Sequence, residues 1–180
     1  FNLNNRKNSE GKWNVAKHKQ NWFRNKDFRA AVDYAVDRKN MVQNIAQGVA
    51  EPLYASESLN SIYLNRKIKG HAQDINKAKE LLLNLGFYLK DGILYDSKNN
   101  RVEFDLLTNA GALERESIGL MVKQDLEELG MKVNFKPIEF NSLVNKLSNT
   151  SDWDMIIIGL TGTGYFDMYA YEKFHNGVLQ

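Results

Sequence analysis

The sequence predicts an α/β fold, with a mixed, mostly parallel sheet flanked by helices. Two segments, residues 102–107 and 131–136, alternate apolar and polar side chains on either side of a helical stretch at 113–129. A connection of helical length between consecutive strands indicates parallel pairing with right-handed crossovers. The sequence WDMIII at 153–158 is continuously apolar after its Asp, which is typical of a further strand covered on both faces.

Helical periodicity fills much of the first half of the chain. Residues 26–48 read as two consecutive amphipathic helices, the second ending at Gly48. A third helix begins after Asp74, a favourable N-cap residue, and ends at Gly86. The intervening residues 49–72 have loop character because they contain Pro and several Ser and Asn residues.

Three shorter elements complete the predicted fold. Asp91-Gly92 is a hairpin turn signal between the short strands at 87–89 and 93–95. A short helix is expected over 140–147. Residues 1–4 alternate apolar and polar side chains, as the end of a strand would.

The net charge of +2 conceals an uneven distribution. Residues 1–26 carry seven basic residues and one acid, so the remaining residues have a net charge of −4. A basic arm can bind nucleic acid or anionic lipid. Here the charges are dispersed among Asn and Gln, which favours an irregular, solvated basic segment over residues 1–25, anchored by Trp13 and Trp22. We therefore expect no nucleic-acid partner.

Composition and motifs point away from an enzyme. The 180 residues include no cysteine, and no apolar run approaches the ~20 residues of a membrane helix. His18, His71 and His175 are far apart and lack the spacing of a metal site. Acid pairs such as Glu114/Glu116 are typical of an exposed helix face. We expect no catalytic residues, no metal and no cofactor.

Polar loops after two of the predicted strands are the best candidates for a ligand site. Ligands of open parallel sheets bind at the carboxyl ends of the strands. One loop is 108–111; the other is 159–164, whose G-x-x-G-x-G spacing lacks the Lys of a phosphate-binding loop. A weaker candidate is 139–141. These loops suit a polar neutral or zwitterionic ligand, and the expected binding residues are Thr108, Asn109, Gly111, Leu160, Thr161, Gly162, Thr163 and Asp167.

Several motifs, in a consistent order, resemble those of the bacterial extracellular solute-binding proteins of family 5, the oligopeptide, dipeptide and nickel receptors of ABC importers. FRAAVDYAVDR at 28–38 is similar to the family signature F-R-x-A-L-x-x-A-x-D-R. Its apolar residues are expected to face a core, and its charged residues to fix helix ends. The other similar segments are DINKAKELL at 74–82 with Gly86-Phe87, LTN at 107–109, LGMKV at 129–133 and DWDM at 152–155.

The resemblance implies that residues 1–180 are a single lobe of a two-lobed receptor, with a class II periplasmic-binding-protein-like fold. The first lobe would precede Phe1. Such a receptor is periplasmic or extracellular, and the full-length protein is expected to be lipid-anchored. It would close on a peptide or other small polar solute by a hinge and dock on the membrane permease subunits of an ABC transporter.

One departure from the family pattern leaves the ligand open. Members that clamp a peptide's amino terminus usually show Gly-Trp-x-x-Asp after the last strand. Here Leu160 follows Gly159, Thr163 occupies the Asp position, and the nearest acid is Asp167. A peptide bound in another way, a sugar or another polar solute remain alternatives.

Two other classes of protein are compatible with the fold. One is a regulatory protein that senses a solute with the same fold, which a helix-turn-helix upstream of this chain would indicate. The other is a small α/β enzyme, which would need a nucleophile and a base converging on the strand ends.

Overall fold

The computed structural model describes the chain except for residues 56, 58, 60, 62, 63 and 160–180. Its helices are α1 (Lys17–Arg24), α2 (Lys26–Ala35), α3 (Arg38–Ile45), α4 (Ile75–Asn84), α5 (Leu113–Glu127) and α6 (Phe140–Asn145), followed by a π-helical turn, η1 (Lys146–Thr150). Its strands are β1 (Tyr88–Lys90), β2 (Ile93–Tyr95), β3 (Glu103–Asn109), β4 (Lys132–Ile138) and β5 (Met155–Ile156). This order confirms the predicted strand-helix-strand arrangement of the second half.

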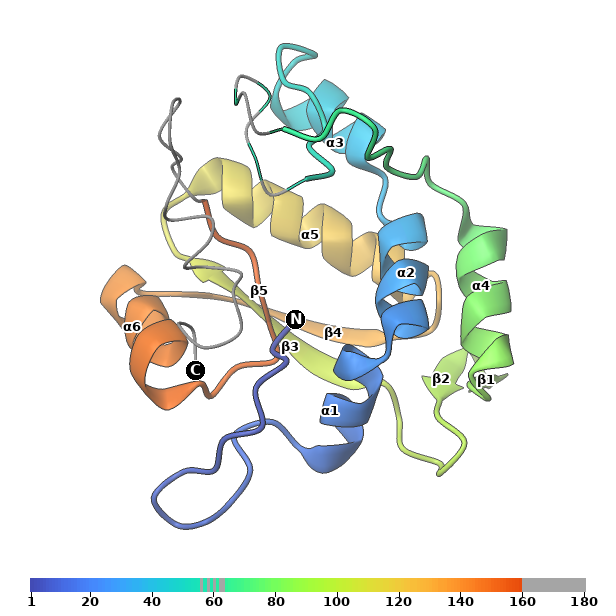
Figure 1. Cartoon of the computed structure of the whole chain (residues 1–180), viewed down its shortest axis with the longest axis vertical. Helices are drawn as coiled ribbons and strands as arrows, with labels where there is room; N and C mark the ends of the chain where they lie inside the picture. The colour runs from blue at the N-terminus through green and yellow to red at the C-terminus, as the bar shows by residue number, and fades with distance from the viewer. Residues whose placement is uncertain (56, 58, 60, 62–63, 160–180) are drawn as a thin grey trace.

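The main sheet is parallel, as predicted. In the described part of the chain its order is β4-β3-β5, with Leu106 opposite Phe135 on one side and Met155 on the other. Strand β4 lies at an edge, where Pro137 is tolerated because a proline cannot donate to a neighbouring strand. Helix α5 connects β3 to β4, and α6 lies between β4 and β5 along the chain (Figure 1).

Helix α5 packs very closely on the sheet. A Cβ atom at Gly119, in the middle of α5, would lie 2.2 Å from Cε2 of Phe135 on β4. Glycine normally destabilises a helix interior, so its presence here is explained by the ring beneath it. Leu106, Val122 and Leu126 belong to the main core between α5 and the sheet. Because side chains alternate between the two faces of a strand, β3 can pack against more than one helix. Helix α6, with its buried Leu143, also packs against β3.

The segment 28–38, which comprises most of α2 and the start of α3, is structural, as expected. Phe28, Ala31, Val32 and Ala35 are buried in the core. The charged residues of this segment fix helix ends: the Asp37 side chain caps α3 by accepting from the backbone N–H of Asn40 at 3.0 Å, and Arg38 donates to the carbonyl of Asp33 at the end of α2. Arg29 likewise donates to the carbonyl of Phe23 in α1.

The expectation of an irregular segment over residues 1–25 is wrong for residues 17–24, which form α1. Tertiary contacts explain this helix. The Trp22 Nε1–H donates to the buried Asp96 carboxylate at 2.9 Å, and the Phe23 ring stacks on Phe1 at 4.8 Å between ring centroids. Among the predicted aromatic anchors Trp22 is buried, whereas Trp13 is exposed and lies beneath the ammonium groups of Lys7 and Lys17.

The hairpin β1–β2 forms as predicted around Asp91 and Gly92, whose φ angles of 52° and 76° are those of a type I′ turn. The Asp96 carboxylate organises the turn that follows by accepting from Asn100 and from the backbone N–H of Lys98. Burial raises the pKa of Asp96, but hydrogen bonds from Asn100, Trp22 and Lys98 outweigh it, so the net shift is downward.

The amino-terminal end of β5 is held by a network of buried polar groups. The buried Asp154 carboxylate accepts from Lys19 Nζ at 2.6 Å and from the backbone N–H of Asp105 at 3.0 Å. The Asn2 side chain, 2% exposed, donates to the carbonyls of Ser151 and Trp153, and its backbone N–H donates to the carbonyl of Asp154.

Two strand expectations need correction. Residues 1–4 follow the start of β5 through these bonds without forming a strand. Strand β5 is also shorter than the predicted 153–158, and its residues Met155 and Ile156 are only partly buried. Trp153 and Asp154 lie before the strand and accept hydrogen bonds from Asn2 and Asp105, respectively.

Candidate functional site

The carboxyl ends of β3 and β5 lie side by side, as the sequence predicts for parallel neighbours. The pairing of Leu107 with Ile156 continues into a bond from the backbone N–H of Ile157 to the carbonyl of Leu107 at 2.9 Å. The end of β4 joins them through a 2.7 Å bond from the backbone N–H of Ala110 to the carbonyl of Ile138. The predicted loops at 108–111 and 159–164 therefore start from one edge of the sheet.

Thr108 lies within β3, so the loop begins later than predicted. The Thr108 side chain has no exposed surface, and its hydroxyl donates to the carbonyl of Ile157 at 3.0 Å. This bond ties β3 to β5 at the carboxyl edge. The hydroxyl hydrogen of Thr108 is already donated within the sheet. The ligand contact predicted for Thr108 stays a prediction.

Asn109 ends β3 and contacts a residue that the sequence reasoning missed. Arg115, in the first turn of α5, donates from Nη1 to Oδ1 of Asn109 at 2.6 Å. Its guanidinium also lies against Gly159: a Cβ atom built on that glycine would be 2.5 Å from Nη2. Arg115 thus connects the ends of both strands. A cation at a helix N-terminus is electrostatically unfavourable, and this was the one signal in the sequence that pointed to it.

Gly111 adopts a left-handed backbone conformation, with φ of +82°, which explains the glycine at this turn. Its backbone N–H donates to Oε1 of Glu116 at 2.7 Å. Glu116 therefore stabilises the loop, and its negative charge suits the N-terminal turn of α5. The 111 N–H group is committed to this bond, while the glycine itself is exposed at the sheet edge.

The third candidate segment, 139–141, caps a helix. The Glu139 carboxylate accepts from the backbone N–H of Ser142 at 2.9 Å. Hydrogen bonds from the backbone N–H groups of Asn141 and Ser142 lower the pKa of Glu139, which keeps it ionised. The adjoining Phe140 is 52% exposed beside the end of β4. Leu160, Thr161, Gly162, Thr163 and Asp167 lie outside the described residues.

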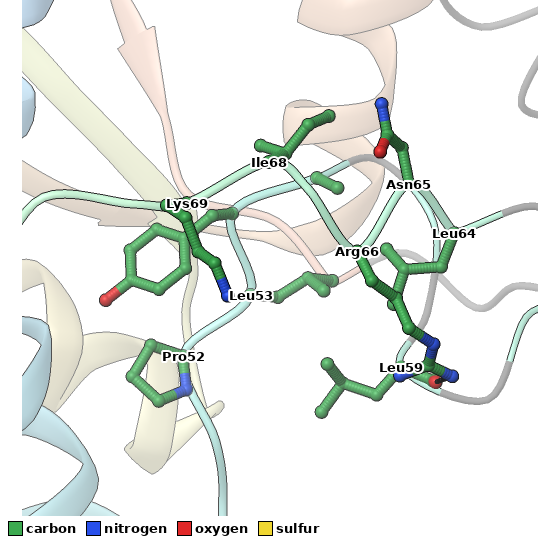
Figure 2. Close-up of a pocket in the computed structure, with 10 residues that line it drawn as sticks. Pro52, Leu53, Leu59, Leu64, Asn65, Arg66, Ile68 and Lys69 are labelled. Atoms are coloured by element: carbon green, nitrogen blue, oxygen red, sulfur yellow. Dashed lines mark hydrogen bonds between the residues drawn. The ribbon is translucent and has the colours of Figure 1, made fainter.

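A separate open hollow of about 340 Å³ lies within the loop between α3 and α4 (Figure 2). The Arg66 and Lys69 side chains border it. None of the strand-end residues lines it, so it is distinct from the carboxyl edge of the sheet. Its apolar lining comes from Pro52, Leu53, Tyr54, Leu59, Leu64 and Ile68.

Neither metal-binding clusters nor membrane spans are found in the described part of the chain. No three His, Asp or Glu side chains described by the structure come together as metal ligands. None of the described helices combines the length and the hydropathy needed to cross a bilayer. The polar groups at the sheet edge are an amide, a guanidinium, carboxylates and backbone groups, which can form hydrogen bonds and carry charge.

Comparison with known proteins identifies close similarities. The family model for bacterial extracellular solute-binding proteins, family 5 Middle, matches residues 1–177. A probable ABC transporter-binding protein of Deinococcus radiodurans is 33% identical over 157 residues, which cover 83% of this chain and 26% of that protein. The oligopeptide-binding protein AppA of Bacillus subtilis is 30% identical over 173 residues, which cover 93% of this chain and 31% of AppA.

Comparison with solved structures also identifies AppA as similar. The structure of Bacillus subtilis AppA in complex with a nonapeptide superposes with a TM-score of 0.77 at 29% identity. The superposition covers 84% of this chain and 31% of the AppA chain. The chain therefore spans about a quarter to a third of the length of these relatives.

Proposed function

The chain belongs to family 5 of the bacterial extracellular solute-binding proteins, and from this premise we propose that it is one lobe of a receptor that binds a peptide or another polar solute for an ABC importer. The family consists of binding proteins for solutes outside the cytoplasm and not of enzymes. The match over residues 1–177 is the observation that carries the proposal.

The geometry of the sheet edge supports this role. Two parallel strands end together, and the Asn109 amide, the Arg115 guanidinium and the turn at Gly111 lie where open parallel sheets bind ligands. Hydrogen bonds and charge at such an edge recognise polar groups of a solute without transforming it. In this proposal residues 108–111 and 159–163, with Asp167, contribute one side of the cleft.

The complete receptor encloses its ligand between this lobe and another one. Closure about a hinge buries a solute that a single lobe would contact on one side only. Bacillus subtilis AppA, which holds a nonapeptide, is roughly three times as long as its match to this chain. In our proposal the closed receptor is attached to the membrane by a lipid and docks on the permease subunits.

The test uses the full-length receptor that contains this chain, purified from its own host. Native mass spectrometry should show a copurifying solute, and isothermal titration calorimetry against a nonapeptide library should show saturable binding. The bound solute should be recovered chemically unchanged. Turnover of the solute, or the absence of both a copurifying and a titratable one, would contradict the proposed function.

A further inference from the structure

Arg115 is placed where it joins three elements of the fold. It lies in the first turn of α5, one turn before Gly119, where the helix is close enough to the sheet to leave no space for a Cβ atom above Phe135. From there its guanidinium reaches Asn109 at the end of β3 and Gly159 after β5. The close approach of α5 is therefore what brings the cation to the strand ends.

A side chain at position 159 would displace the Arg115 guanidinium. The backbone at Gly159 is not in the left-handed region, so the main chain alone would accept a side chain. The obstacle is Arg115: an added Cβ would lie 2.5 Å from Nη2 and 3.1 Å from both Cζ and Nε. The three short distances mean that the guanidinium packs over the Cα atom of Gly159.

The electrostatics of the helix N-terminus do not account for an arginine at this position. The N-terminal turn of a helix disfavours a cation, and Glu114 and Glu116 beside it provide the charges that the turn prefers. The hydrogen bond to Asn109 is charge-assisted and directional, and the planar guanidinium adds a flat contact surface that a lysine lacks. These properties suit a residue that fixes the relative position of two strand ends.

We propose that Arg115 is a positioning residue for ligand binding, which clamps Gly159 against Asn109. Asn109 ends β3 and Gly159 follows β5, so the clamp fixes the relative position of these two strand ends at the edge where the proposed function places the solute. An effect of the clamp on ligand binding rests on the proposed function, whereas the clamp itself is a property of this lobe.

Two readouts on the full-length receptor test the clamp. The first is hydrogen–deuterium exchange of the ligand-free protein: R115A should speed exchange about tenfold at the amide of Ile157, which donates to the Leu107 carbonyl beside the clamp. The second is the affinity for the single nonapeptide that the wild-type receptor binds most tightly: R115A should weaken it about tenfold, with the melting temperature changed by less than about 2 °C. R115K, which retains a donor for Asn109, should recover part of the exchange protection and part of the peptide affinity.

Gly159 provides the decisive cross-check. G159A should weaken binding in the wild-type background, because its Cβ displaces the guanidinium, but should add little when R115A has already vacated the space. The matched control is R101A, which removes an exposed arginine at the opposite end of β3 and should change neither readout. Equal effects of G159A in both backgrounds, or unchanged exchange in R115A, would overturn the clamp. If the wild-type receptor binds no peptide, the peptide assignment fails, while the exchange measurement still decides whether the clamp exists.

Discussion

The two ends of β5 are held in different ways. At its amino-terminal end the buried side chains of Asn2 and Asp154 make a dense set of bonds, including an ion pair with Lys19. At its carboxyl end the Thr108 hydroxyl and the partly buried Arg115 are the side chains that the structure shows joining it to β3 and α5. One end is anchored in the core, whereas the other is positioned at the surface.

Under the proposed function, this difference separates stability from ligand binding along a single short strand. Buried polar groups are costly to leave without partners, so changes at the amino-terminal end should destabilise the lobe most. Changes at the carboxyl end remove fewer contacts, so they should alter the geometry of the edge at a smaller cost in stability. The following predictions test that division, beginning with the largest expected effect.

Asp154→Ala should destabilise the lobe most, by about 3 kcal/mol, because it leaves the partly buried Lys19 ammonium and the Asp105 N–H without their acceptor. Urea unfolding followed by far-UV circular dichroism measures this loss. The control is Asp152→Ala, which removes an exposed acid paired with Lys146 and should cost less than about 0.5 kcal/mol. Similar losses in both variants would contradict an anchored amino-terminal end.

Asn2→Ala should cost about 2 kcal/mol, since two carbonyl acceptors, on Ser151 and Trp153, lose the amide that bonds to them. Asn5→Ala, an exposed neighbour, serves as the matched control. The same unfolding experiment applies. Equal stability of the Asn2 variant and the wild type would show that the first residues do not anchor β5.

Thr108→Val should cost about 1 kcal/mol, because it replaces a hydroxyl that donates to the Ile157 carbonyl with a methyl group of similar size. Thr108→Ser keeps the donor and separates its contribution from that of packing. We expect Thr108→Val, more than Thr108→Ser, to increase hydrogen exchange at the Ile157 amide, which donates to the Leu107 carbonyl. If the serine variant is the more perturbed one, packing and not the hydrogen bond holds this end of the strand.

The smallest expected effect is a pH dependence of stability due to His18, whose neighbour Lys19 pairs with Asp154 at the amino-terminal end of β5. Burial, followed by the neighbouring Lys19 charge, lowers the pKa of His18, against the opposing influence of Asp96 and Asp154. The unfolded chain therefore binds a proton more readily than the folded one, so stability falls as pH drops below about 6.5, the ordinary histidine pKa.

His18→Gln should remove that part of the pH dependence. Because His18 is partly exposed, we expect only about 0.3 kcal/mol between pH 7.5 and pH 5.5 after solvent screening. Urea unfolding of both proteins at the two pH values measures it. A steeper loss of stability in the variant would contradict the direction given for His18.

Much of the fold follows from local signals. Asp74 caps α4 through the N–H of Lys77, and Asp91-Gly92 forms the hairpin turn, because both depend on residues close in sequence. The parallel pairing of β3 and β4 follows from the length of the helix between them.

The missed features depend on distant partners. Helix α1 looks polar and irregular in sequence, and its Trp22 is placed by Asp96, 74 residues away. Arg115 was equally hidden, because its contact with Gly159 appears only when β5 is laid beside β3. The strand-end rule located the edge, but the side chain that spans it required the three-dimensional arrangement.

The contact between Gly119 and Phe135 makes the core a source of variation at the carboxyl edge of the sheet, where we propose that the solute binds. Any residue larger than glycine at position 119 must displace either α5 or the Phe135 ring, and Arg115 moves wherever the helix does. An evolving receptor could therefore retune its ligand preference through a buried substitution that never touches the solute. Screens that mutate only the residues lining a cleft would overlook such a route to altered selectivity.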